Sequence, residues 1–98
     1  MQSNIAVRFY CGDTDYSGII KNLSENGMFI STKQMSFPFD PVIEIFIPLK
    51  EKLLRVPVKV CRMTKSKDVF DGIGVQLLDD HKDYLELVCC LRDNRFPF

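Results

Sequence analysis

Apolar and polar residues alternate along the first three-quarters of the chain, and a period of two is typical of β-strands with one buried face. In the first such run, residues 5–10, the side chains of Ile5, Val7 and Phe9 share one face and Arg8 lies on the other. Five further strands are predicted by similar runs, over residues 16–23, 28–32, 42–49, 54–60 and 73–77. The chain is therefore expected to be mainly β.

Turn residues separate the second and third of these runs. The sequence NLSENG, residues 22–27, leads into the apolar segment GMFI, and its Gly27 is suited to a positive φ. The two flanking strands are expected to pair as an antiparallel hairpin, with Ile19 and Leu23 facing the core. In the last predicted strand, Gly72 and Gly74 leave room for a closely packed neighbour.

The period changes after residue 78, where a helix is predicted over about residues 80–92, with Asp79 or Asp80 suited to cap it. The apolar residues assigned to one face of this helix are Tyr84, Leu85, Val88 and Leu91. Short strands followed by one helix predict a single domain over residues 1–98. It comprises a closed or nearly closed antiparallel barrel over about residues 4–78, a helix on its mouth or flank, and a tail over residues 93–98.

Composition limits the classes of function that fit this chain. Its 13 basic and 13 acidic residues give a formal net charge of zero, which argues against a DNA- or RNA-binding protein because such proteins carry a basic excess. There is no apolar run of membrane-spanning length and no signal-peptide pattern, so we expect a cytoplasmic protein without membrane insertion. The four cysteines form no CxxC pair and His81 is the single histidine, so no metal site, cofactor or catalytic set is predicted.

Several segments together resemble the PilZ domain family. NLSENG matches the family's (Asp/Asn)-x-Ser-x-x-Gly motif through Asn22, Ser24 and Gly27, between the apolar segments GIIKNLS and GMFIST. GIGVQLL, residues 72–78, resembles the family's closing strand and also precedes a helix. The resemblance spans roughly residues 5–92. It implies a split-barrel type of fold, a six-stranded antiparallel β-barrel with a C-terminal α-helix, and a bacterial signalling domain that binds cyclic di-GMP and passes the signal to a partner.

The resemblance also implies a ligand site. Asn22 and Ser24 lie two residues apart on a strand and so present their polar groups together, while Gly27 lets the backbone approach the ligand. An amide and a hydroxyl can bond guanine edges or phosphate oxygens. Arg8 is the candidate for a neighbouring cation, whereas Arg62 is a weaker candidate and is left out of the predicted site.

One part of the family's binding pattern is missing from this sequence. The family carries an Arg-x-x-x-Arg arm just before its first strand, but residues 1–4 contain no arginine, and the fifth position counted from Arg8 is Gly12. Either the arm was lost or never present, or the chain begins downstream of it. Two charge-assisted contacts of ~1.5–3 kcal/mol each are then absent, which weakens binding by about a hundredfold or more.

A second hypothesis makes the chain a degenerate PilZ-like adaptor of the pilus or motility type, which binds proteins and no nucleotide. Only Glu86 is polar in the helical segment YLELVCCL, so apolar side chains extend beyond one face. Leu87 and Cys90, together with Phe96 and Phe98 of the tail, form a candidate surface for a protein partner or a homodimer. A wide contact with the core is the alternative for the helix.

Overall fold

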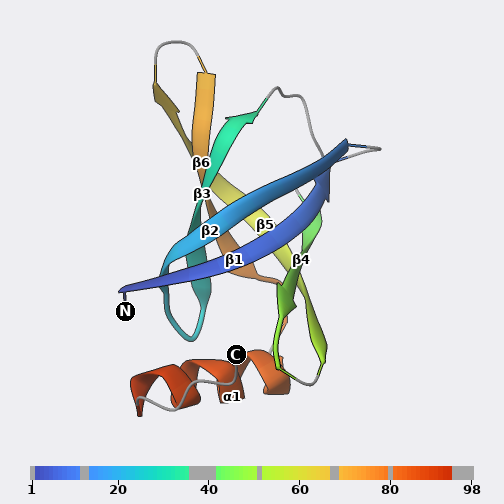
Figure 1. The fold of residues 1–98 in the computed structure, drawn as a ribbon, viewed down its shortest axis with the longest axis vertical. Helices are drawn as coiled ribbons and strands as arrows, with labels where there is room; N and C mark the ends of the chain where they lie inside the picture. The colour runs from blue at the N-terminus through green and yellow to red at the C-terminus, as the bar shows by residue number, and fades with distance from the viewer. Residues whose placement is uncertain are drawn as a thin grey trace.

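The computed structural model describes residues 2–11, 14–35, 42–50, 52–66, 69–79 and 81–93. Within these residues six antiparallel strands close into a barrel in the order β1-β2-β3-β6-β5-β4 (Figure 1). The strands are β1 (Gln2–Cys11), β2 (Thr14–Leu23), β3 (Gly27–Met35), β4 (Val42–Pro48), β5 (Leu53–Ser66) and β6 (Val69–Leu77). The predicted fold is confirmed.

Alternating apolar residues fill the inside of the barrel. On β4, for example, Ile43, Ile45 and Ile47 are buried and the intervening Glu44 is exposed. The barrel closes where β1 pairs with β4, with Arg8 opposite Phe46 and Phe9 opposite Ile45. Closure leaves no sheet edge between these strands, which removes a template for edge-to-edge association.

The strands pair with several register shifts, and two of these are β-bulges that interrupt the alternation on β2 and β5. On β2, Ile20 pairs with Ile30 and Asn22 pairs with Phe29, so Lys21 is an extra residue. On β5, Val60 pairs with Val75 and Arg62 pairs with Gly74, so Cys61 is extra. The first bulge corrects one prediction, because Ile20 is buried and Ile19 is 40% exposed, although Leu23 does face the core.

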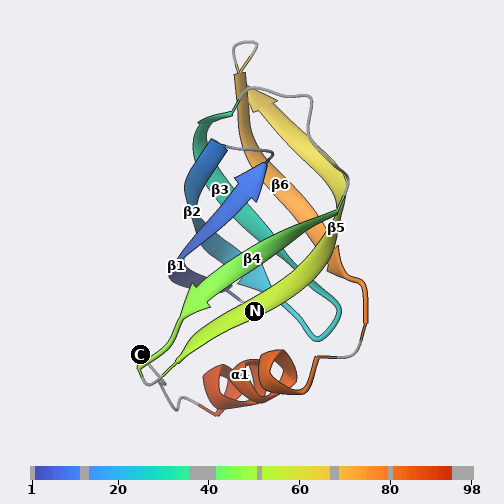
Figure 2. The ribbon, with the colours of Figure 1, turned by 90° about the vertical axis from the view of Figure 1, so that its right-hand side faces the viewer.

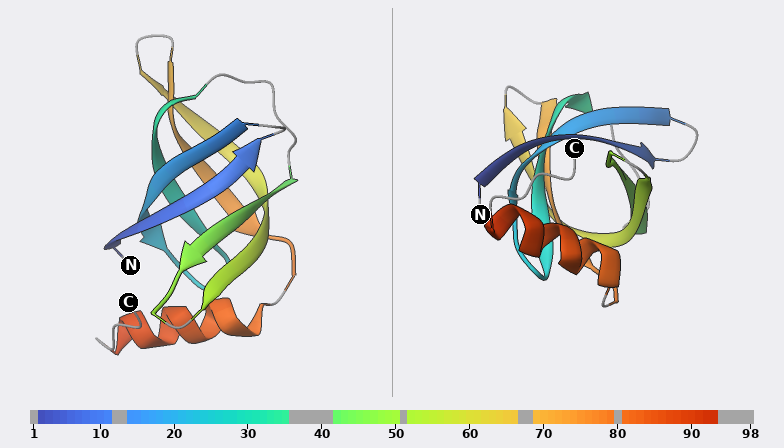
Figure 3. Two further views of the ribbon diagram at one scale, coloured as in Figure 1. Left: turned by 45° about the vertical axis from the view of Figure 1, so that its right-hand side comes forward. Right: turned by 60° about the horizontal axis from the view of Figure 1, so that its bottom comes forward.

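Helix α1 (Lys82–Arg92) lies across one end of the barrel, as Figures 1 and 2 show from two sides. The view from below in Figure 3 shows the helix crossing the ring of strands at that end. The predicted cap at Asp79 or Asp80 is wrong: the N-cap is His81, whose Nδ1 accepts a hydrogen bond from the Tyr84 amide at 3.2 Å. The helix therefore begins one residue later than an Asp80 cap requires.

The buried face of α1 differs from the predicted one. Tyr84, Leu87 and Val88 belong to the core, with exposed fractions of 0%, 2% and 0%, and Leu91 packs against it. These four positions are i, i+3, i+4 and i+7, the spacing of a single helix face. Placing Leu87 on an outer, partner-binding surface was wrong, because its side chain seals the barrel end. Cys90 is half-buried, and Phe96 and Phe98 lie outside the described residues.

No helix among the described residues is both long enough and apolar enough to cross a membrane.

Candidate ligand-binding site

A cleft of about 420 Å³ opens on the outside of the barrel where the β2–β3 turn meets β6 and β5. It lies at the end of the barrel that α1 covers, because the turn contacts Tyr84 of that helix. Its volume is within the range of small-molecule sites, about 300–1,000 Å³. The residues that line it are Asn22, Leu23, Ser24, Asn26, Gly27, Met28, Phe29, Cys61, Arg62, Gly74, Val75 and Gln76.

The three motif residues lie together at this cleft. Asn22 and Ser24 are exposed near the end of β2, and Gly27 begins β3. The turn between them is closed by a hydrogen bond of 2.9 Å from the Ser24 amide to the Gly27 carbonyl oxygen. The Ser24 hydroxyl approaches the same oxygen at 3.4 Å, a long contact that a stronger acceptor can replace. Asn22 and Ser24 are therefore available to a ligand.

Gly27 has a different structural role from the predicted one. Its φ is not in the left-handed region, so the prediction of a positive φ was wrong. A Cβ at this position would lie 2.3 Å from the carbonyl oxygen of Val75, which no side chain can tolerate. Glycine is required because β3 and β6 approach closely here, and this approach places the turn beside the rest of the cleft.

The cation at the cleft is Arg62, which sequence reasoning had left out. Its Cζ lies 5.6 Å from the centroid of the Phe29 ring, a cation–π arrangement across the outer surface of the barrel. Gly74 makes room for it, since a Cβ there would come within 2.8 Å of the Arg62 Cγ. The predicted close neighbour of Gly74 is thus confirmed and identified as Arg62. The bulge at Cys61 turns the arginine outward, because strict alternation from the buried Val58 would point it inward.

Arg8 does not reach the cleft. It pairs with Ser17 on β2, five residues before Asn22, a separation of about 16 Å at the rise of a β-strand. Its guanidinium forms an ion pair with Asp15. Arg8 is therefore removed from the candidate site. A strict alternation of inward and outward side chains does not predict Arg62 in its place, because a bulge sets the direction of the Arg62 side chain.

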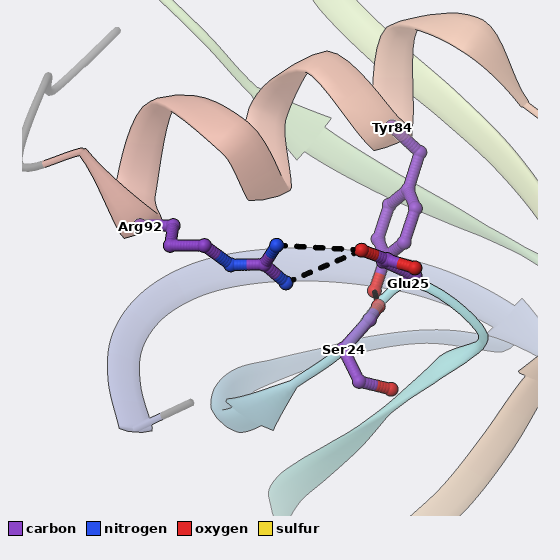
Figure 4. Close-up of polar contacts among 4 residues, drawn as sticks. All are labelled: Ser24, Glu25, Tyr84 and Arg92. Atoms are coloured by element: carbon purple, nitrogen blue, oxygen red, sulfur yellow. Dashed lines mark hydrogen bonds and ion pairs between the residues drawn. The ribbon is translucent and has the colours of Figure 1, made fainter.

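The electrostatics of the cleft suit an anion. Arg62 is the charged residue among the described residues that line it, and none of them is acidic. Glu25, in the motif turn, forms an ion pair with Arg92 of α1 at 3.4 Å, and this pair offsets its negative charge (Figure 4). Lys21, next to Asn22 in sequence, lies on an adjoining hollow and donates to the Asn4 side chain at 3.0 Å.

Tyr84 links the motif turn to α1. Its hydroxyl lies 2.7 Å from the Ser24 carbonyl oxygen and 2.9 Å from that of Gly27, and Figure 4 shows the ring reaching from the helix to the turn. Burial raises the pKa of the Tyr84 phenol above its usual range, so the group remains a hydrogen-bond donor at physiological pH. Sequence reasoning had assigned this tyrosine to the core, which is correct for its ring, but had no signal for its hydroxyl.

Among the described residues no group of three or more His, Cys, Asp or Glu side chains could hold a metal ion.

A closed six-stranded barrel with a cation-bearing cleft on its outside defines a small β-barrel binding domain. The sequence matches the PilZ domain family over residues 1–92, and the chain therefore belongs to that family of cyclic di-GMP-binding signalling domains.

Comparison with solved structures supports the same fold. The chain is similar to a crystal structure described as the PilZ domain of CeSA from a cellulose-synthesizing bacterium, with a TM-score of 0.60. The two share 22% sequence identity, and the match covers 93% of this chain and 91% of the other. Comparison with curated proteins finds no significant match.

Proposed function

We propose that the cleft binds cyclic di-GMP and that the domain passes its occupancy to a partner. The observation that carries this proposal is the meeting of Asn22, Ser24 and Gly27 with Arg62 in one cleft whose described lining has no carboxylate. Guanine presents acceptors at O6 and N7, which suit a guanidinium, while amide and hydroxyl groups suit its other edges or the phosphates. Family membership supports the same ligand.

Arg62 has a specific role in this proposal. Its guanidinium lies over Phe29, and Arg62 is exposed among the residues that line the cleft. A guanine base can stack on a guanidinium plane, since guanidinium groups and aromatic rings both stack on bases. Arg62 would then supply part of the positive charge that the Arg-x-x-x-Arg arm supplies elsewhere in the family.

The place of a basic arm follows from the register of β1. Gln2, the first residue of that strand, pairs with Asn22, so a segment running into β1 would arrive beside the motif. Arginines from such a segment or from a partner chain would complete the grip on the ligand. With Arg62 alone we expect weak binding, about a hundredfold or more below that of a site with both arm arginines.

Isothermal titration calorimetry with cyclic di-GMP tests the proposal. We expect saturable binding by the natural sequence and about tenfold weaker binding by Ser24→Ala, because one hydrogen bond to the ligand is lost. Ser17→Ala is the matched control: it makes the same change on an exposed residue of β2, beside Arg8 and away from the cleft.

Two results would count against the proposal. One is an absence of heat at high micromolar ligand, which would leave the adaptor hypothesis as the better account of the domain. The other is equal weakening by Ser24→Ala and Ser17→Ala, which would place the ligand elsewhere. The adaptor hypothesis itself has lost Leu87 as a contact residue, since that side chain is buried.

A further inference from the structure

We propose that Tyr84 is a positioning residue of the ligand site: its hydroxyl holds the motif turn in its binding shape and thereby couples the docking of α1 to ligand binding. The inference rests on the proposed function for its ligand. Its structural part, the restraint of the turn by the hydroxyl, can be measured without any ligand.

The contacts of the Tyr84 hydroxyl join the two ends of the motif turn. Its two acceptors are the carbonyl oxygens of Ser24 and Gly27, at 2.7 Å and 2.9 Å, and these are the second and third residues of the binding motif. One donor shared between two carbonyls fixes the distance across the turn. The orientation of the Ser24 peptide, and with it the direction of the Ser24 side chain, depends on this contact.

The other end of the tyrosine is fixed just as firmly. Its side chain is fully buried in the core, so the ring cannot swing away from the turn. The helix start is anchored through His81, whose Nε2 lies 2.9 Å from the Arg55 carbonyl oxygen on β5 and whose Nδ1 accepts from the Tyr84 amide. A neutral ring with its proton on Nε2 satisfies both contacts. The Tyr84 hydroxyl therefore keeps its position beside the turn only while α1 is docked on the barrel.

Packing between the turn and α1 is open, although two backbone hydrogen bonds of 2.9 Å also hold the turn, from the Ser24 amide to the Gly27 carbonyl oxygen and from the Leu77 amide to the Asn26 carbonyl oxygen. A hollow of about 310 Å³ separates the turn from the beginning of α1, with Glu25, Asn26, His81 and Leu85 among its lining residues. Among the described residues, the other polar contact between helix and turn is the Glu25–Arg92 ion pair, which is exposed at both ends and contributes little by comparison. Tyr84 is thus the main restraint that α1 places on the turn.

Coupling follows from these contacts by linkage. If docked α1 holds the turn in the shape that binds ligand, ligand binding must stabilise docked α1 by the same factor. A partner that contacts α1 would then sense whether the cleft is occupied, and the signal would travel through one hydroxyl group.

Tyr84→Phe tests the proposal because it removes the hydroxyl and keeps the buried ring. In the ligand-free protein we expect the Ser24 amide, which closes the turn, to exchange its hydrogen about tenfold faster, as the loss of one hydrogen bond predicts. In calorimetry we expect the dissociation constant for cyclic di-GMP to rise about tenfold. Val7→Ala is the control, because Val7 is buried in the core but lies on β1, paired with Gly18, rather than in α1 or the motif turn. At a temperature where all variants are folded, it should leave both measurements unchanged.

Each outcome decides a separate question. Unchanged Ser24 exchange in Tyr84→Phe overturns the positioning role. Faster exchange with an unchanged dissociation constant overturns the coupling, as does an equal loss of affinity in Val7→Ala, which would mean that stability alone is responsible. If the natural sequence binds no cyclic di-GMP, the proposed function and the coupling to that ligand both fail, and the exchange measurement alone decides the positioning role.

Discussion

Single residues at the cleft owe their positions to neighbours far away in the sequence. A side chain at Gly27 would clash with the carbonyl oxygen of Val75, and a side chain at Gly74 would clash with the side chain of Arg62. The sequence motif predicted which residues of the β2–β3 turn would be exposed, and Asn22 and Ser24 are indeed exposed. It could not predict Arg62, because the residues that make that arginine part of the site, Phe29 and Gly74, come from two other strands.

The role of Arg62 can be separated from that of an ordinary surface arginine. We expect Arg62→Ala to weaken cyclic di-GMP binding by about ten- to a hundredfold, because a charge-assisted contact and a stacking surface are both lost. Arg8→Ala removes an equal charge at a position paired with Asp15 and about 16 Å along the strands from Asn22. Calorimetry at one salt concentration compares the two variants. Equal losses of affinity would mean that Arg62 acts only through the net charge of the domain.

At the scale of the elements, the two β-bulges explain where prediction failed. A strict period of two correctly predicts the buried residues from Ile5 to Phe9 on β1 and from Ile43 to Ile47 on β4. It fails on β2 and β5, where Lys21 and Cys61 are inserted and the following residues change sides. Both bulges lie beside the cleft, and they turn Asn22 and Arg62 outward. The bulges depend on strand pairing, which local sequence does not reveal.

Helix α1 offers a prediction at the same scale. Leu87→Ala should lower the free energy of unfolding by about 2–5 kcal/mol, because it leaves a cavity where the helix seals the barrel. Cys90→Ala, at a half-buried position three residues later, should cost clearly less. Urea denaturation followed by circular dichroism compares the two. A larger loss for Cys90→Ala would contradict the buried position of Leu87 at the end of the barrel.

On the scale of the whole molecule, barrel closure brings the site together. The sequence order alone places β5 and β6 after β4, but in the barrel β6 lies between β3 and β5. That order puts Arg62 and Gly74 beside the motif turn. Arg8, on β1, pairs with Ser17 of β2 and lies far from the turn. The fold class and half of the site were predictable from alternation and the family motif. The other half, Arg62 and Gly74, could be assigned to the site only once the order of the strands in the barrel was known.

An amide NMR titration of the domain with cyclic di-GMP reports both whether the ligand binds and where on the barrel it binds. If the cleft is the binding site, we expect the resonances of Gly27, Gly74 and Gln76, on the two strands that form the floor of the cleft, to move with a common saturation curve. The resonances of Arg8 and Ser17 should stay unchanged. No movement up to high micromolar ligand, or movement centred on Arg8 and Ser17, would contradict binding at the cleft.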